Sequence, residues 1–140
     1  MAFFNYFGIS VSALTAERLR LDVIANNLAN IETTRVNEEG EPVPYRRKSV
    51  VFAERLEQAM YGPQGRGVKV AAIVEDDAPS RMVYQPDHPD ANEQGYVAYP
   101  NVNVVNEMID MVGAVRAYEA NIQALEASKQ IVRHALEIGR

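Results

Sequence analysis

The chain has 140 residues, of which 47% are hydrophobic and 24% are charged, with a formal net charge of −5 and no cysteine. A chain of this length can bury one modest core. Its composition indicates neither global disorder nor a membrane-spanning class, and its negative charge argues against a nucleic-acid partner. The lack of cysteine excludes disulfides, thiolate zinc sites and cysteine nucleophiles. No stretch approaches the roughly 20 apolar residues that span a bilayer and no cleaved secretory signal is recognisable, so we expect no direct membrane insertion.

A heptad pattern of apolar residues runs through segment 1–36. Its members recur at steps of seven or follow such a position by three residues, and they are Phe7, Leu14, Leu21, Ile24, Leu28 and Ile31. This spacing predicts an amphipathic helix whose apolar seam packs against another helix, as in a coiled coil. Large apolar side chains also gather at the start of the chain, at Phe3, Phe4, Tyr6, Phe7 and Ile9. We expect these to need a partner surface, because they are costly to leave in water.

Segment 37–103 contains all seven prolines and five of the eight glycines. This punctuation predicts a small β-rich insert that ends in a proline-rich return loop. Runs rich in Val, Ile, Phe and Tyr favour strands at 46–52, 68–74 and 81–84. The residues between and after these runs favour a turn or two of helix at 54–60, a loop at 62–67 and an ordered loop at 85–100.

Segment 104–140 has the most regular apolar pattern of the chain. Its positions are separated by alternating steps of four and three, and they are Val104, Met108, Met111, Val115, Tyr118, Ile122, Leu125, Lys129, Val132 and Leu136. They predict one long helix, with Asn103 or Asn106 as its amino-terminal cap and Gly139 as its stop signal. Such a helix would be on the order of 50 Å long, which exceeds the diameter of a domain of this size.

The predicted fold is therefore mainly α with a small β insert. Long amino- and carboxyl-terminal helices pack as a coiled-coil-like pair, with a short β-hairpin or sheet between them in the sequence. The longer helix cannot cover its whole apolar stripe within one compact monomer, so part of the stripe is expected to meet other chains. The alternative is an αα-hairpin in which the two ends pack only on each other.

The best catalytic candidate is His88, because a histidine flanked by carboxylates can act as a base or a metal ligand. The other histidine, His134, has no Asp or Glu four residues further along its helix to complete a chelate. The glycine-rich run at 62–67 lacks the Lys-Ser/Thr ending of a phosphate-binding loop. The sequence thus predicts no catalytic residue, no cofactor and no metal site, and Asp and His in the proline-rich loop are interpreted as turn formers.

Two segments resemble the signatures of the flagellar axial family of rod and hook proteins. The amino-terminal segment is Leu21–Asn30, LDVIANNLAN. The carboxyl-terminal segment is Asn101–Met108, NVNVVNEM, and it continues to RAYEAN at 116–121. The length of 140 residues is similar to that of the small proximal-rod subunits, since hook and distal-rod members carry much larger inserts. The resemblance runs nearly end to end, and the acidic segment 36–41 is the least family-like stretch.

The resemblance implies a structural role in the bacterial flagellum. A member of this family is exported by the flagellar type III apparatus and assembles in the periplasm as part of the proximal rod, which is a drive shaft that transmits torque. Its implied partners are other rod subunits, further copies of itself, and the membrane ring and export apparatus of the flagellum. The family signatures map onto Asn26, Asn27, Leu28 and Asn30 and onto Arg116, Tyr118, Glu119 and Asn121.

The predicted subunit interface combines these signature residues with the apolar seams. It comprises Phe7, Leu14, Leu21, Ile24, Asn26, Asn27, Leu28, Asn30, Ile31, Met108, Met111, Val115, Arg116, Tyr118, Glu119, Asn121, Ile122, Leu125, Val132 and Leu136. Two other functions stay open at this point. One is a coiled-coil adaptor that binds a partner outside the flagellum, and the other is a small hydrolase that uses His88.

Overall fold

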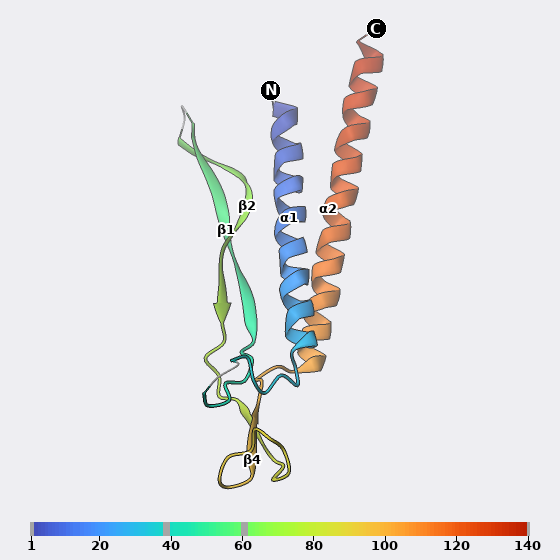
Figure 1. Cartoon of the computed structure of the whole chain (residues 1–140). Coiled ribbons are helices and arrows are strands. Elements are labelled where there is room, and N and C mark those ends of the chain that lie inside the picture. Colours follow the sequence, from blue (N-terminus) through green and yellow to red (C-terminus); the bar gives the residue numbers. More distant parts are fainter. Residues whose placement is uncertain (1, 38–39, 60–61, 140) are drawn as a thin grey trace. The chain divides into compact units, whose positions relative to one another are not determined.

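The computed structural model describes residues 2–37, 40–59 and 62–139. Its elements follow in the order α1 (Ala2–Ala29), β1 (Lys48–Ala59), β2 (Gly62–Glu75), β3 (Arg81–Tyr84), β4 (Tyr96–Tyr99) and α2 (Val104–Ile138) (Figure 1). The strands form two separate two-stranded sheets, β1 with β2 and β3 with β4. The predicted class, mainly α with a small β insert between terminal helices, is confirmed.

The first helix ends earlier than the heptad pattern suggests. α1 stops at Ala29, and residues 30–36 form a turn followed by irregular backbone. The amides of Ile31 and Thr33 reach back only three residues, to Leu28 O at 3.5 Å and Asn30 O at 3.1 Å. The side chain of Asn30 also competes for the backbone, because its Nδ2 donates to Asn26 O at 2.9 Å. These contacts tighten the last turn and end the helix.

The second helix begins and ends at the predicted signals. The Oδ1 of Asn103 accepts from the amides of Val105 at 3.0 Å and Asn106 at 3.2 Å, so Asn103 is the amino-terminal cap. α2 then runs for 35 residues. It ends at Ile138, and the amide of Gly139 donates to Ala135 O at 3.3 Å just past the end.

The first sheet is longer than the sequence suggests. β1 continues through residues 54–59, where a turn or two of helix was expected, and Met60 lies outside the described residues. β2 begins at Gly62, so the expected loop at 62–67 is also wrong. Glu, Leu, Gln and Ala are strong helix formers, but pairing between β1 and β2 overrides this local preference.

The second sheet contains a strand, β4, in the segment 85–100 for which the sequence favours an ordered loop. β4 pairs antiparallel with β3, with Val83 opposite Val97 and Tyr84 opposite Tyr96. Asn92 organises the connection, because its Oδ1 accepts from the amides of Gln94 at 3.0 Å and Tyr96 at 2.9 Å. The Val97 side chain is completely buried, so this face of the small sheet belongs to the core.

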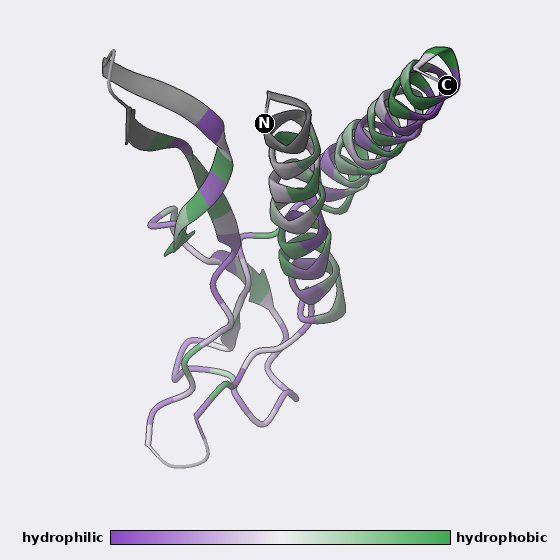
Figure 2. Ribbon diagram, turned by 90° about the horizontal axis from the view of Figure 1, so that it is seen from above, coloured by the Kyte–Doolittle hydropathy of each residue, from purple (hydrophilic) through white to green (hydrophobic). Residues whose placement is uncertain are grey.

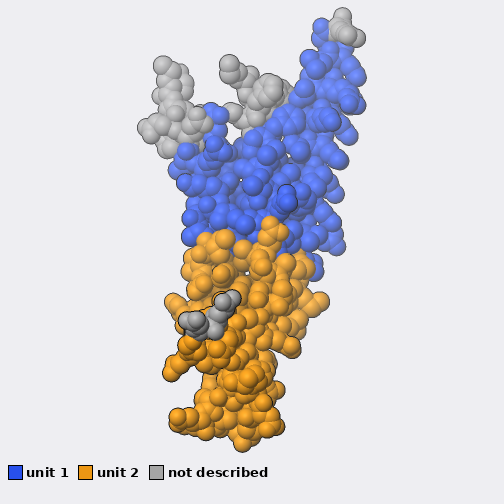
Figure 3. Space-filling view, viewed as in Figure 1, with its two compact units in different colours: residues 1–21, 50–72, 112–140 blue, residues 22–49, 73–111 orange. Residues whose placement is uncertain are grey.

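The chain divides into two compact units, coloured separately in Figure 3. Unit 1 comprises residues 1–21, 50–72 and 112–140, and unit 2 comprises residues 22–49 and 73–111. Among the described residues, the buried apolar side chains include Ala16 and Ala114 in unit 1 and Val23, Ile24 and Val97 in unit 2. Unit 2 also buries the polar side chains of Asn27, Thr34 and Glu107. Among the described residues of unit 2, the largest fully buried side chains are Glu107, Val97, Asn27 and Pro100, and two of these four are polar.

Candidate subunit interface

The predicted interface residues of α1 are largely covered within the chain. The half-buried ones on α1 are Phe7, Leu14, Leu21 and Leu28, and Asn30 and Ile31 in the turn after α1 are half-buried as well. Asn26 is exposed, whereas Ile24 is 5% exposed and Asn27 has no exposed surface. Ile24 and Asn27 are therefore covered within the single chain, and the interface role predicted for them stays a prediction. The side chains of Phe3, Phe4 and Tyr6 lie outside the described part of the chain.

The predicted interface residues of α2 fall on two sides of the helix. The half-buried ones are Met111, Tyr118, Asn121, Ile122, Leu125 and Val132, and the exposed ones are Met108, Val115, Arg116, Glu119 and Leu136. Two buried residues share the half-buried side, because Glu107 precedes Met111 by four positions and Ala114 precedes Tyr118 by four. One side of α2 therefore packs within the chain, and the other is free.

The free side carries a row of large apolar side chains near the start of α2. Val105 is 64% exposed, Met108 57% and Ile109 65%, and these three residues are called the α2 stripe below. Their i, i+3 and i+4 spacing puts them on one face of the helix. Val112 continues the spacing along the same helix and is also exposed. In Figure 2 the ribbon of α2 alternates between green, apolar turns and purple, polar ones along its length.

Met108 of this row belongs to the interface predicted from the sequence, whereas Val105 and Ile109 do not. A single seam of alternating steps cannot contain adjacent positions, and Val104–Val105 and Met108–Ile109 are adjacent apolar pairs. Such pairs widen the apolar arc beyond one seam, so they were the available signal for a helix with two apolar sides.

The buried Asn27 ties the end of α1 to the strand and helix that follow it in unit 2. Its Nδ2 donates to Lys48 O at 2.8 Å and to the Glu107 Oε2 at 3.0 Å. Its Oδ1 accepts from the Lys48 amide at 2.9 Å and from the Tyr45 hydroxyl at 3.0 Å. The side-chain amide thus makes four hydrogen bonds, which compensates its burial.

Glu107 is the second buried member of this network. Its Oε1 accepts from the Nε of Arg47 at 2.6 Å, and Arg47 also donates from Nη2 to Asp110 at 3.3 Å. The backbone amide of Arg47 donates to the Oδ1 of Asn101 at 3.0 Å. We call Asn27, Tyr45, Arg47 and Glu107 the polar clamp, because they join the end of α1, the approach to β1 and the first turn of α2.

The polar clamp keeps its donors and acceptors matched. Burial, followed by the charges of Glu107 and Glu75, raises the pKa of Tyr45 above its ordinary value. The Tyr45 hydroxyl therefore stays protonated and can donate to Asn27. Glu107 also lies in the first turn of α2, where a negative charge interacts favourably with the helix dipole. The two family-like signatures thus meet inside one chain, through Asn27 from the first and Glu107 from the second.

A second polar group fixes the proline-rich return segment to the chain that follows α1. The Oδ2 of Asp90 accepts from the Thr34 hydroxyl at 2.8 Å, and its Oδ1 accepts from Arg35 Nη2 at 2.6 Å. The amide of Asp90 donates to the Nδ1 of His88 at 3.1 Å. His88 is therefore engaged in the turn, and no group of three or more His, Cys, Asp or Glu residues in the described part of the chain could hold a metal ion.

This group gives a pH-dependence prediction. Hydrogen bonds from Thr34 and then from Arg35 lower the pKa of Asp90. A lowered folded-state pKa means that the carboxylate contributes stability above its ordinary value, 3.8, and that this contribution is lost as the pH falls through the folded pKa. Acid titrations of thermal unfolding between about pH 5 and pH 2 should therefore show a smaller loss of stability in Asp90→Asn than in the original chain. If the stability of the two proteins falls equally on acidification, Asp90 does not contribute stability through a lowered pKa. The control is Asp87→Asn, which changes an exposed carboxylate.

The described helices include none that is both long and apolar enough to cross a membrane.

The comparison with known families is informative at both ends of the chain. The protein-family model described as "Flagella basal body rod protein" matches residues 7–35 of the sequence. The family model described as "Flagellar basal body rod FlgEFG protein C-terminal" matches residues 93–138. These matches contain Asn27 and Glu107, the two buried residues of the polar clamp.

Curated relatives match over the full length. The flagellar basal-body rod protein FlgC of Bacillus subtilis is 47% identical over 100% of both chains, and that of Escherichia coli O157:H7 is 43% identical, also over 100% of both. The corresponding protein of Borreliella burgdorferi is 43% identical over 99% of this chain and 98% of its own. The fold and the matches at both ends define a structural protein of the flagellar basal-body rod. Within that class, the chain belongs to the FlgC family of flagellar basal-body rod proteins.

Membership of this family bears on the functions left open by the sequence. The family is a family of structural proteins, so the chain is not an enzyme. The alternative of a small hydrolase that uses His88 is therefore not supported. An adaptor outside the flagellum is not favoured either. The chain is a structural subunit of the basal-body rod, and it assembles there with other rod components.

Proposed function

We propose that this chain is exported by the flagellar type III apparatus and joins the proximal rod in the periplasm through exposed faces of its terminal helices. In the rod it transmits torque to the neighbouring subunits and contacts further copies of itself. The membrane ring and the export apparatus are its partners on the side of the cell membrane. Membership of the family concerns the rod as a whole. The position in the proximal rod and the contacts named here go beyond it.

The observation that carries the proposal is the α2 stripe. Three large side chains, Val105, Met108 and Ile109, are each more than half exposed on one helix face. Burying a fully exposed side chain of this kind contributes about 1.5–3 kcal/mol, and the exposed part of the stripe gains its share of this only by meeting a partner. A contact between unlike surfaces whose rotation does not close generates a helical polymer, which is the form a rod requires.

The test places a charge in the stripe. In a strain that lacks its own copy of this protein, we expect Ile109→Asp to reduce the number of complete rods about tenfold or more, since the loss of one buried side chain and the burial of a charge weaken each contact. Rods are counted in electron micrographs of isolated basal bodies, with swimming in soft agar as the second measure. Circular dichroism should show that the variant still folds, because residue 109 is exposed.

The matched control is Asn106→Asp, which adds the same charge to an exposed position of the same helix. It should leave rod number and swimming near those of the original chain. If Ile109→Asp also assembles and swims normally, the stripe is not a contact surface and the proposed route of assembly is wrong.

A further inference from the structure

The small sheet of unit 2 has an exposed face opposite the buried Val97. Met82 pairs with Ala98, and Tyr84 pairs with Tyr96, so these four side chains lie on one side of the sheet. Met82 is 53% exposed and Tyr96 41%, and the rings of Tyr84 and Tyr96 meet edge to face with centroids 5.3 Å apart. The β3–β4 sheet therefore presents an apolar and aromatic surface to the solvent.

A groove lies over part of this face, within unit 2. Its volume is about 530 Å³, and Met82, Tyr96 and Ala98 line it together with Pro42. Two further lining residues are acidic, Glu41 and Glu93, and both are exposed. In the described part of the chain neither carboxylate forms an ion pair, whereas Asp90, which also lines the groove, is already paired with Arg35. The groove thus combines an apolar lining with uncompensated negative charge.

A groove with an apolar lining and acidic side chains is suited to bind a segment that carries a positive charge next to apolar side chains. A lysine or arginine side chain can lay its methylene stem on the apolar lining and bring its charged end to the carboxylates. A groove of this size is within the range that takes several side chains of a binding partner.

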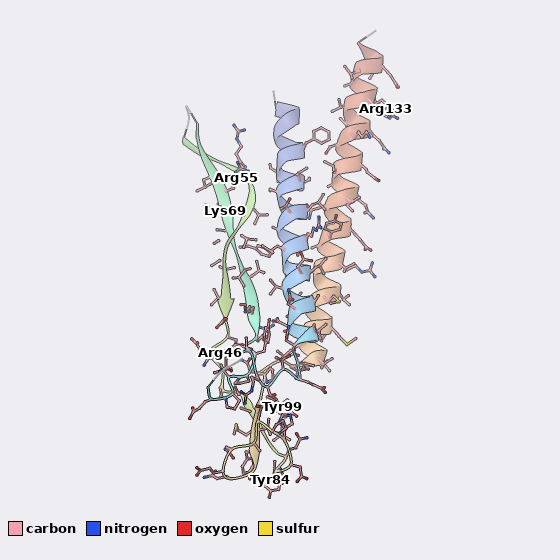
Figure 4. The ribbon with its side chains drawn as sticks, viewed as in Figure 1. Arg46, Arg55, Lys69, Tyr84, Tyr99 and Arg133 are labelled. Atoms are coloured by element: carbon pink, nitrogen blue, oxygen red, sulfur yellow. The ribbon has the colours of Figure 1, made fainter. Side chains whose placement is uncertain are left out.

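The chain carries a matching surface on its other sheet, in unit 1. Arg55 on β1 and Lys69 on β2 are exposed, and neither is ion-paired to a described residue (Figure 4). Val51 lies four positions before Arg55 on the same strand, so both point to the same face, and Val51 is 44% exposed. A subunit that polymerises head to tail needs two unlike, complementary patches on one chain, and this pair of surfaces provides them.

We propose that the acidic groove of unit 2 binds the part of the β1–β2 sheet that carries the exposed Arg55 and Lys69 in a second copy of this chain. The proposal rests on the proposed rod function and names one contact within it. The occupant is a second copy rather than another rod subunit, because the complementary charge and the neighbouring apolar side chain are both present in this sequence.

The absence of native cysteine allows a direct test by cross-linking. A chain with Glu93→Cys and Arg55→Cys is produced in a strain that lacks its own copy, basal bodies are isolated, and disulfide formation is induced with a mild oxidant. We expect multimers on a non-reducing gel that disappear on reduction, since a disulfide forms only when the two Cα atoms come within about 7 Å. Chains with either single cysteine, and the pair Glu93→Cys with Arg18→Cys, should give none.

A charge reversal provides the second measurement. Glu41→Lys with Glu93→Lys should reduce rod number about tenfold, because like charges then face each other. Adding Arg55→Glu and Lys69→Glu to the same chain should restore most of it. A loss without rescue would show that the occupant is not a second copy, and normal assembly of the first variant would show that the groove is unoccupied. Should the reversed variant fail to fold, as judged by circular dichroism, the cross-link decides.

The outcomes separate this inference from the function on which it rests. Rods that contain the double-cysteine chain but give no multimers, together with a charge reversal that Arg55→Glu and Lys69→Glu do not rescue, would overturn the groove contact and leave the rod function standing. A failure of the unaltered chain to restore rods in the same strain would overturn the rod function itself.

Discussion

Replacing Glu107 with alanine is expected to lower the free energy of unfolding by about 3 kcal/mol, at the low end of what removing one partner of a buried ion pair costs. The side chain has no exposed surface and accepts from Arg47 Nε at 2.6 Å and from Asn27 Nδ2 at 3.0 Å. Its loss leaves the Asn27 amide with an unpaired buried donor. Asp110 still contacts Arg47, at 3.3 Å, which is why we expect the low end of the range.

Urea unfolding followed by circular dichroism measures this effect. The control is Glu119→Ala on the same helix, where the carboxylate is exposed and pairs with Arg116 only across one turn, at 3.7 Å. It should change the free energy of unfolding by no more than about 0.5 kcal/mol. A loss below about 1 kcal/mol in Glu107→Ala would mean that the polar clamp does not hold unit 2 together.

Gly67→Ala should destabilise unit 1 by about 2–4 kcal/mol, through backbone strain and a steric clash. Gly67 has φ of 109°, which residues with a side chain rarely adopt, and an added Cβ would overlap the Ser12 Oγ and stand 3.2 Å from the Ile9 Cα. That serine hydroxyl accepts from the Val68 amide at 3.0 Å and donates to Ile9 O at 2.7 Å. The β2 strand must therefore move away from α1 and lose the contact that Ser12 makes with it.

Thermal unfolding of the purified chain tests this prediction, with amide exchange of α1 as a local measure. Gly113→Ala is the matched control, because Gly113 lies inside α2 and an added Cβ there meets nothing within 4 Å. It should stabilise the chain by about 0.5–1 kcal/mol, since alanine is the better helix former. If both glycine variants unfold at the same temperature, β2 does not approach α1 as closely as described.

The parts of the fold that follow from local signals were predictable from the sequence. α2 is an example, because its apolar spacing repeats over ten positions and Asn103 and Gly139 mark its ends by hydrogen bonds to nearby backbone. The sheet boundaries were not predictable in this way. Residues 54–59 prefer a helix locally, and only pairing with β2, which depends on residues further along the chain, makes them a strand.

Some residues of the candidate interface could likewise be predicted from local sequence signals, and others could not. Met108 was predictable because it belongs to the regular apolar seam of segment 104–140, whereas Val105 and Ile109 lie outside that seam. Asn27 was recognised in its signature, but its contact with Glu107 joins residues 80 positions apart, and no local pattern reveals such a pair. The structure thus gives a physical reason for the presence of both residues, which is the matching of buried donors and acceptors inside one subunit.

The most direct test of the proposed assembly is a map of the intact basal-body rod by electron cryomicroscopy at a resolution that shows side chains. We predict that Val105, Met108 and Ile109 of each copy of this chain are covered by a neighbouring subunit in the rod. If the three side chains face solvent there as they do in the single chain, the rod is held together by other surfaces and our account of its assembly is wrong.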